Sequence, residues 1–313
     1  MEKIAVLIPC YNEERTIGSV VSDFKKQLSE ALIYVYDNNS NDNTAIFAQQ
    51  AGAIVQSEKR QGKGHVLRSM FRQIDANIYI MVDGDGTYPA ERVHDLIAPI
   101  ISGDADMVCG SRLHPQAESD FKWLNWMGNK AFLHLIKFIF NIQITDMLSG
   151  YRALNRNIVK SLPIRSSGFE IETELTLKAI ERRYRILEIP VDLISRPEGS
   201  SSKIKIFRDG LLILNTILAI LRDYKPLTAF GSVGLFLVLL GFVPGIIVIH
   251  EFLTTGYILR IPSAILAVGL VLSGILVIFS GVILHTLSRR FQDLEIQLQN
   301  FIELYLNQFR HDK

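Results

Sequence analysis

Residues 4–24 read IAVLIPCYNEERTIGSVVSDF, a sequence typical of a buried strand that runs into a helix. Residues 4–8 form a continuous apolar run of the length expected for a strand buried on both faces. Residues 16–29 follow after a short polar stretch and carry apolar residues at helical spacing. The stretch therefore predicts one strand, a polar turn and one helix.

The same unit recurs along the chain. Apolar runs rich in Ile, Val and Tyr lie at 32–36, 53–55, 78–82 and 107–109. Helical segments lie between them at 43–51 and 64–74. Strands that alternate with helices predict a mostly parallel sheet with helices on both faces, which is a Rossmann-like α/β fold. Ligands of such sheets bind beyond the carboxyl ends of the strands. The residues that follow the strands are therefore the candidates for chemistry.

Acidic and other polar residues occupy these positions. The residues directly after the predicted strands include Pro9, Tyr11, Asn12 and Glu13, then Asp37, then Asp83, Gly84 and Asp85. Paired carboxylates suit Mg²⁺ or Mn²⁺, which completes its coordination with water and phosphate oxygens. The glycine between them lets a ligand approach the backbone. Solvated acidic turns are a common alternative, and Tyr11 fits either a stacking face or the core. The convergence of three acidic strand ends favours a metal–diphosphate site.

A cation between two glycines opens the helix expected at 64–74. Gln61-Gly62-Lys63-Gly64 suits phosphate binding, because a helix start presents backbone N–H groups to anions. It is not a P-loop, since the required length and the Lys-Ser/Thr pair are absent. A simple helix-initiating turn is the alternative.

Two apolar stretches follow in the second half of the chain. Residues 226–249 and 261–284 contain no Asp, Glu, Lys, Arg or His, and each is long enough to cross a bilayer. Basic residues flank the pair on the outside, at Arg222, Lys225 and Arg289. The positive-inside rule then predicts a two-span protein of the cell membrane with both termini in the cytoplasm. The spans hold no ionisable residue that would indicate transport.

The segments beside the spans are helical. Residues 203–221 are amphipathic, which fits a helix in the membrane interface or a packed surface helix. From Leu287 to Tyr305 apolar residues recur in steps of four and three, which predicts a coiled coil between copies of the chain or packing on the same chain. Four parts are expected: a catalytic domain at 1–202, interfacial helices at 203–225, a two-helix anchor at 226–285 and a C-terminal helix at 286–313.

Composition excludes some classes of protein. The formal net charge is +1 and no long basic run occurs, so a nucleic-acid-binding surface is not expected. Cys10 and Cys109 are the only cysteines, and both lie in apolar runs. This usage suits a reducing compartment and not a disulfide framework. The first ten residues resemble a buried strand and not a signal peptide.

Several short motifs occur in a fixed order. They are Pro9-Cys10-Tyr11-Asn12-Glu13, Asp37-Asn38-Asn39-Ser40, Gly62-Lys63-Gly64, Asp83-Gly84-Asp85-Gly86, Gly110-Ser111-Arg112, Asp146-Met147-Leu148-Ser149-Gly150-Tyr151-Arg152, Phe169-Glu170-Ile171-Glu172 and Gly199-Ser200-Ser201-Ser202-Lys203. The ordered set resembles the family 2 glycosyltransferases of GT-A fold. It is most similar to the polyprenyl-phosphate sugar transferases, such as dolichyl-phosphate mannose or glucose synthases and their bacterial undecaprenyl-phosphate relatives. The resemblance covers residues 3–222.

The resemblance implies a set of roles. The nucleotide sugar would be held by Pro9, Tyr11, Asn12, Glu13, Asp37, Lys63, Asp83, Glu172, Ser202 and Lys203. Mg²⁺ or Mn²⁺ would bind Asp83 and Asp85, and the acceptor phosphate would meet Arg112 and Lys130. The catalytic set would be Asp83, Asp85, Arg112 and Asp146.

Departures and structural alternatives accompany these roles. Asn38 stands where many relatives have a second Asp, and Thr87 where some have a Gln. Arg112 could instead pair with Asp106, Asp146 could cap a helix, Glu172 could lie on an exposed helical face, and Lys130 could anchor a helix in the membrane interface.

The expected activity is inverting transfer of a sugar from a nucleotide sugar to a polyprenyl phosphate. UDP-glucose or UDP-N-acetylglucosamine is favoured as donor, and the product would be a lipid-linked monosaccharide for envelope glycans or glycoproteins. A lipid phosphate is already anionic near neutral pH, since its second pKa is about 6, so no strong general base is required. Two alternatives remain: a GDP-mannose-dependent mannosyltransferase, and an inactive membrane scaffold that binds nucleotide sugars. A processive polysaccharide synthase would need further spans and a Gln-x-x-Arg-Trp motif.

Overall fold

The chain folds into two units, Met1–Ile217 and Leu218–Lys313. The computed structural model describes residues 2–112, 144–168, 170–194 and 225–311, together with residue 137 and a few residues between 211 and 223. Three of the predicted site residues, Lys130, Ser202 and Lys203, lie outside the described residues.

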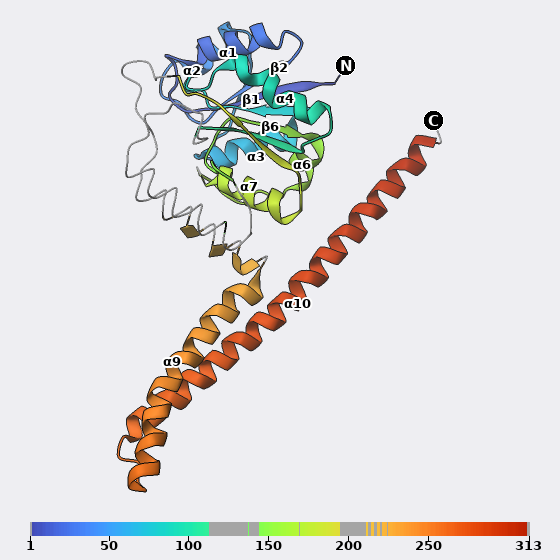
Figure 1. Ribbon diagram of the computed structural model, residues 1–313. Coiled ribbons are helices and arrows are strands. Elements are labelled where there is room, and N and C mark those ends of the chain that lie inside the picture. Colours follow the sequence, from blue (N-terminus) through green and yellow to red (C-terminus); the bar gives the residue numbers. More distant parts are fainter. Residues whose placement is uncertain are drawn as a thin grey trace. The chain divides into compact units, whose positions relative to one another are not determined.

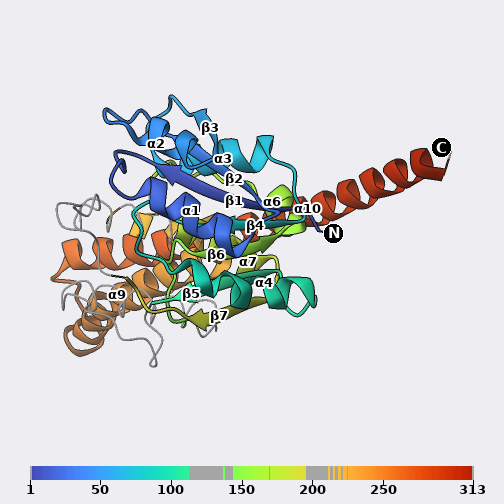
Figure 2. The same cartoon turned by 90° about the horizontal axis from the view of Figure 1, so that it is seen from above.

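A seven-stranded sheet forms the centre of the first unit, with the order β3-β2-β1-β4-β6-β5-β7 (Figure 2). The strands are β1 (Ile4–Cys10), β2 (Leu32–Asp37), β3 (Ile54–Ser57), β4 (Ile78–Met81), β5 (Met107–Ser111), β6 (Arg152–Asn155) and β7 (Ile186–Pro190). β6 runs antiparallel to β4 and β5, and the other neighbours are parallel. The mostly parallel sheet is therefore confirmed, and β6 and β7 add to the strands that the apolar runs predicted.

Helices cover both faces of the sheet (Figure 1). One face carries α1 (Ile17–Gln27), α2 (Thr44–Gln50), the short turn η1 (Ala90–Arg92) and α4 (Val93–Ile101); the other carries α3 (Lys63–Gln73), α6 (Arg156–Ser161) and α7 (Ile171–Glu181). Alternate residues of β1 divide between two cores: Val6 and Ile8 pack towards α1, whereas Leu7 packs towards α3. Because both of their faces are buried, the central strands β1 and β4 are apolar along their length.

Helix α7 is buried around its whole circumference, although it carries charged residues. Glu172, Thr173, Glu174, Thr176 and Lys178 each expose 4% or less of their surface. Charged side chains are almost never buried unless they are paired, and here Lys178 pairs with Glu174 at 2.6 Å. The alternative that placed Glu172 on an exposed helical face is therefore wrong.

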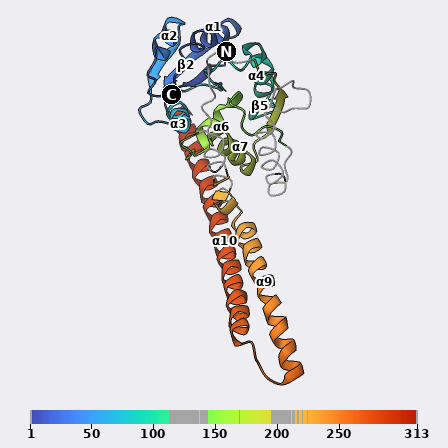
Figure 3. The same ribbon diagram turned by 90° about the vertical axis from the view of Figure 1, so that its left-hand side faces the viewer.

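The second unit is a helical hairpin of α9 (Pro226–Thr255) and α10 (Ile261–His311), which lie side by side (Figure 3). Pro226–Thr255 and Ile261–Phe291 are long and apolar enough to cross a membrane, each with a mean hydropathy of 2.6. α10 runs unbroken for 51 residues. The helix expected at 286–313 is thus continuous with the second apolar stretch.

Small residues form the contact between α9 and α10. Buried positions recur every seven residues, at Gly234 and Gly241 on α9 and at Ala267, Gly274 and Gly281 on α10. A Cβ atom added to Gly234 would lie 2.6 Å from the carbonyl oxygen of Gly274, and the reverse substitution would meet the same distance. Small residues of this kind let helix backbones approach closely in apolar surroundings.

Candidate active site

The turns after β1 and β2 are joined by hydrogen bonds. Cys10 lies opposite Asp37 in the parallel register, so both strands end at the same edge of the sheet. Asn12, with a positive φ of 51°, donates its backbone N–H to Ser40 Oγ at 2.9 Å. Its Oδ1 accepts the backbone N–H of Asn41 at 2.8 Å. The predicted convergence of these two strand ends is observed, and Asn12 holds the turns together.

The other predicted residues after β1 lie at the same edge. Pro9 pairs in register with Tyr36 of β2. Tyr11 and Glu13 are half-buried, and the backbone N–H of Glu13 donates to Thr44 Oγ1 at 2.8 Å. Half-burial leaves part of the Tyr11 side chain exposed and not enclosed in the core.

Asp37 and Asn38 follow β2 but differ in their roles. Asp37 Oδ1 is buried without a hydrogen-bond partner among the described residues, a state that a donor from a ligand would relieve. Asn38 Nδ2 donates to the carbonyl oxygens of Glu58 and Arg60, both at 2.8 Å, and its Oδ1 accepts the Gly62 N–H at 2.6 Å. Asn38 therefore holds the 58–62 loop.

The charged side chains of Lys63, Asp83 and Glu172 meet near the end of β4. Lys63, at the start of α3, forms ion pairs with Asp83 and with Glu172 Oε1 on α7, the latter at 2.5 Å. Burial alone would lower the pKa of Lys63, but Asp83 and Glu172 raise it, so the ammonium stays charged. Burial raises the pKa of Glu172, and the Lys63 charge opposes part of that rise. Glu172 Oε2 has no hydrogen-bond partner among the described residues.

The glycines around Lys63 have a packing role that the sequence did not indicate. A Cβ atom on Gly62 would lie 2.1 Å from the Ser167 carbonyl oxygen, and one on Gly64 would lie 2.2 Å from the Ser166 carbonyl oxygen. The backbone N–H of Gly64 donates to the Ser167 carbonyl at 3.1 Å. The 165–168 segment thus packs against the start of α3, and the Gly64 N–H is taken by a carbonyl of that segment. Phosphate binding at Lys63 stays a prediction.

The glycine between the paired carboxylates is explained in the same way. A Cβ atom on Gly84 would lie 2.6 Å from Cys10 Sγ, so close packing on β1 by itself accounts for the glycine. The approach of a ligand at Gly84 stays a prediction. Asp85 exposes 8% of its surface, and its Oδ1 accepts the backbone N–H and the hydroxyl of Thr87, at 3.2 and 2.7 Å.

Asp83 and Asp85 fit a hard divalent cation by the chemistry of their oxygens. The Asp83 side chain is 30% exposed, which leaves its carboxylate accessible from outside. Among the described residues, no group of three or more His, Cys, Asp or Glu side chains is arranged to hold a metal. A cation on these two residues would therefore take its other ligands from water and from a bound diphosphate.

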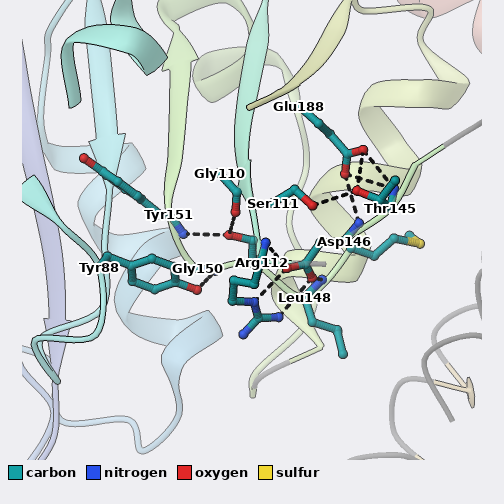
Figure 4. Close-up of polar contacts among 12 residues, drawn as sticks. Tyr88, Gly110, Ser111, Arg112, Thr145, Asp146, Leu148, Gly150, Tyr151 and Glu188 are labelled. Carbon is teal, nitrogen blue, oxygen red and sulfur yellow. Dashed lines mark hydrogen bonds and ion pairs between the residues drawn. The ribbon is translucent and has the colours of Figure 1, made fainter. Parts of the chain in front are cut away.

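Arg112 and Asp146 form a bidentate ion pair beside this site (Figure 4). Arg112 Nε and Nη2 donate to Asp146 Oδ2 and Oδ1 at 2.7 and 2.9 Å, and the Arg112 backbone N–H also donates to Oδ2. Burial works to raise the pKa of Asp146, but the charge and hydrogen bonds of Arg112 lower it below its ordinary value. The alternative pairing with Asp106 is wrong, because Asp106 pairs with Arg185.

The loop that carries Asp146 touches the carboxylate of Asp83. A Cβ atom on Gly150 would lie 2.4 Å from Asp83 Oδ2, so only glycine permits this approach. The buried hydroxyl of Tyr88 accepts the Gly150 N–H at 3.0 Å and fixes the loop at that point. The Asp83–Lys63 part and the Arg112–Asp146 part therefore belong to one site.

Sequence reasoning missed two residues that organise this site. Glu188 on β7 accepts the backbone N–H groups of Thr145 and Asp146, at 2.8 and 2.9 Å. It went unnoticed because β7 was not predicted. Tyr88 follows the Asp83–Asp85 motif closely, and that proximity was the available signal.

Comparison with known proteins shows which family the sequence matches. The family described as "Glycosyl transferase family 2" matches residues 5–162. The chain is 34% identical to glycosyltransferase AglJ of Haloferax volcanii, over 74% of this chain and 77% of that one. It is 29% identical to a dolichyl-phosphate hexose transferase of the same organism, over 72% and 96% of the two chains.

A solved structure shares the fold at lower identity. The crystal structure of glucosyl-3-phosphoglycerate synthase from Mycobacterium tuberculosis, in complex with Mn²⁺, UDP-glucose and phosphoglyceric acid, has a TM-score of 0.61. The identity is 21%, and the match covers 70% of this chain and 79% of that one.

Proposed function

The chain belongs to glycosyltransferase family 2 and is a hexosyltransferase, and from that premise we propose that it transfers a hexose from a nucleotide sugar to a polyprenyl phosphate with inversion at the anomeric carbon. The donor we favour is UDP-glucose or UDP-N-acetylglucosamine. A relative is named for hexose transfer to dolichyl phosphate, which supports the acceptor class.

One observation carries the proposal. The Asp83 carboxylate lies against Gly150, in the loop that begins with Asp146. The part of the site suited to a metal–diphosphate therefore adjoins the part that holds Arg112. Both phosphates of the reaction, that of the leaving nucleotide and that of the acceptor, can then reach one anomeric carbon.

The nucleotide would lie over the ends of β1 and β2. The unpaired Oδ1 of Asp37 would accept a hydrogen bond from the nucleoside, and Tyr11 would offer its ring. Asp83 and Asp85 would hold Mg²⁺ or Mn²⁺, which would neutralise charge on the departing diphosphate. The fold neighbour described above was solved with Mn²⁺ and UDP-glucose, and this supports that choice.

The acceptor would bind at Arg112. Asp146 accepts hydrogen bonds from Nε and Nη2 of Arg112 and so fixes the plane of the guanidinium. A guanidinium held in this way is suited to binding a phosphate. Because the acceptor oxygen is already anionic, these residues need only orient it in line with the anomeric carbon. Lys130, Ser202 and Lys203 remain assigned by the family resemblance.

The helical hairpin would keep the enzyme at the membrane that holds its lipid acceptor. Withdrawing an isoprenoid from the bilayer costs about 0.8 kcal/mol per CH₂ group, so the enzyme must work at the membrane. We place α9 and α10 across the cell membrane, with both termini in the cytoplasm. Further along α10, exposed apolar residues recur in steps of four and three, at Leu287, Phe291, Leu294 and Leu298. They support a homo-oligomer, a dimer or tetramer, which light scattering in detergent would test.

The experiment is a donor panel. Purified full-length protein in detergent would receive undecaprenyl or dolichyl phosphate, a divalent metal, and labelled UDP-glucose, UDP-N-acetylglucosamine or GDP-mannose in turn. A lipid-linked sugar from a UDP-sugar is expected. Asp85→Asn should abolish turnover, whereas Asp23→Asn, on the exposed face of α1, should not. Product from GDP-mannose alone would establish the mannosyltransferase alternative, and no product from any donor would favour the inactive scaffold.

A further inference from the structure

Two adjacent polar pairs join residues 111–112 to residues 145–146 (Figure 4). Ser111 Oγ and Thr145 Oγ1 are 2.7 Å apart, and the next residues along, Arg112 and Asp146, form the bidentate ion pair. The two pairs bring together points that are 34 residues apart in the sequence. The position of Arg112 therefore depends on what holds Thr145 and Asp146.

Glu188 is the residue that holds them. Its Oε2 accepts the Thr145 backbone N–H at 2.8 Å and the Thr145 hydroxyl at 3.0 Å, and its Oε1 accepts the Asp146 backbone N–H at 2.9 Å. Glu188 lies opposite Cys109 in the pairing of β7 with β5. The sheet thus fixes the backbone of Glu188, and its carboxylate accepts hydrogen bonds from the turn at Thr145 and Asp146.

The direction of the hydroxyl bonds follows from this arrangement. An ionised carboxylate only accepts, so the Thr145 hydroxyl proton is directed to Glu188. The Thr145 oxygen must then accept the proton of Ser111. Glutamine cannot reproduce this pattern, because one of its two polar ends is a donor and would face an N–H group.

We propose that Glu188 is a positioning residue for the acceptor phosphate: it fixes Asp146, which in turn fixes the Arg112 guanidinium. The inference rests on the proposed function, in which Arg112 meets the acceptor. Glu188 itself contacts the turn and not the substrate. Loss of its carboxylate should therefore weaken use of the acceptor and leave binding of the nucleotide sugar largely intact.

The test compares Glu188→Gln with the wild-type enzyme in steady-state kinetics, with the polyprenyl phosphate and the nucleotide sugar varied in turn. We expect the acceptor KM to rise about tenfold to a hundredfold, the worth of one hydrogen bond to a charged group. The donor KM should stay within about twofold, since that part of the site is untouched. Thr145→Val, which removes the hydroxyl, should shift the acceptor KM in the same direction, and Thr145→Ser should restore it.

Asp106 provides a matched control. Its carboxylate accepts the Arg185 backbone N–H and Asn155 Nδ2, both at 2.9 Å, and so ties β5, β6 and β7 at their other ends. Asp106→Asn should lower stability without a selective rise in the acceptor KM. Equal effects of Asp106→Asn and Glu188→Gln on both KM values would overturn the proposal, because Glu188 would then act through stability alone.

Amide hydrogen exchange supplies a readout that does not depend on turnover. Glu188→Gln should speed exchange at Thr145 and Asp146, the two amides that the carboxylate accepts, and leave Arg185 unchanged. Unchanged exchange at the two amides would refute the positioning role even if activity fell. If the wild-type enzyme used no polyprenyl phosphate, the proposed function would fail, and exchange would still decide whether Glu188 holds the turn.

Discussion

Gly150→Ala should separate activity from stability. The added Cβ would lie 2.4 Å from Asp83 Oδ2, whereas ordinary contact begins at 3.4 Å, so the carboxylate must move by about 1 Å. A displacement of that size at reacting groups costs about a hundredfold in rate, or about 2.7 kcal/mol of transition-state stabilisation. We therefore expect kcat/KM for hexose transfer to fall about a hundredfold.

The free energy of unfolding should change much less. Overpacking costs about 1–3 kcal/mol, and the low end applies because the Asp83 side chain is 30% exposed and can shift. Replacing glycine by alanine returns about 0.4–1 kcal/mol through the unfolded chain, since Gly150 does not need a positive φ. Chemical denaturation should therefore show a change within about 1 kcal/mol.

The assay is transfer of labelled sugar at a series of divalent metal concentrations. Gly18→Ala is the control, because a Cβ atom there meets nothing within 4 Å. Full activity and an unchanged metal dependence in Gly150→Ala would refute the reasoning, since the Asp83 carboxylate would then tolerate displacement. A loss of activity matched by a loss of folded protein would also count against it.

Three further predictions concern the loops and the hairpin. Asn38→Asp should destabilise the protein by about 2 kcal/mol or more in chemical denaturation, because a carboxylate would replace the amide that donates to two backbone carbonyls; wild-type stability would disprove the role of Asn38 in the loop. Hydrogen bonds from the Arg60 guanidinium and the Ser69 hydroxyl lower the pKa of Glu58 from 4.5, against the effect of burial. The resulting stability is present above pH 4.5 and is lost as pH falls below it. The Tm of the wild-type protein should therefore fall between about pH 7 and pH 3, and the Tm of Glu58→Gln should fall less. An equal fall in both proteins would contradict this. Gly274→Ala should lower thermal stability in detergent, because its Cβ would meet the Gly234 carbonyl at 2.6 Å, whereas the Cβ of Gly269→Ala would meet nothing within 4 Å, so that substitution should be neutral. Equal effects of the two substitutions would argue against the close backbone contact.

The central parallel strands β1 and β4 could be predicted because they are buried on both faces. Each is an unbroken apolar run, and the polar residues after β1, β2 and β4 do lie at one edge. β6 could not be found in this way, because it begins with Arg152, a fully buried cation that sequence rules assign to the surface. α7 has no amphipathic pattern for the same reason, since its charged residues are buried in ion pairs.

The glycines show a second limit of sequence reasoning. Gly62, Gly64 and Gly150 each lie against atoms remote in sequence, namely the 166–167 backbone and the Asp83 carboxylate. A local motif can indicate that glycine is needed but not which distant segment requires it. Residue types and order were enough to suggest the chemistry of Asp83 and Arg112. Their supports, Glu188 and Tyr88, depend on tertiary pairing.

Helix α10 has a mechanical consequence. At 1.5 Å per residue its 51 residues make a rod of about 76 Å, while the hydrocarbon layer of a bilayer is only about 30 Å thick. In the membrane placement proposed above, more than half of the rod would therefore stand outside the apolar layer. Because the helix is continuous, a tilt or rotation at one end would be transmitted to the other end. The thickness of the bilayer and any contact made by the C-terminal turns would therefore act on the same rigid element.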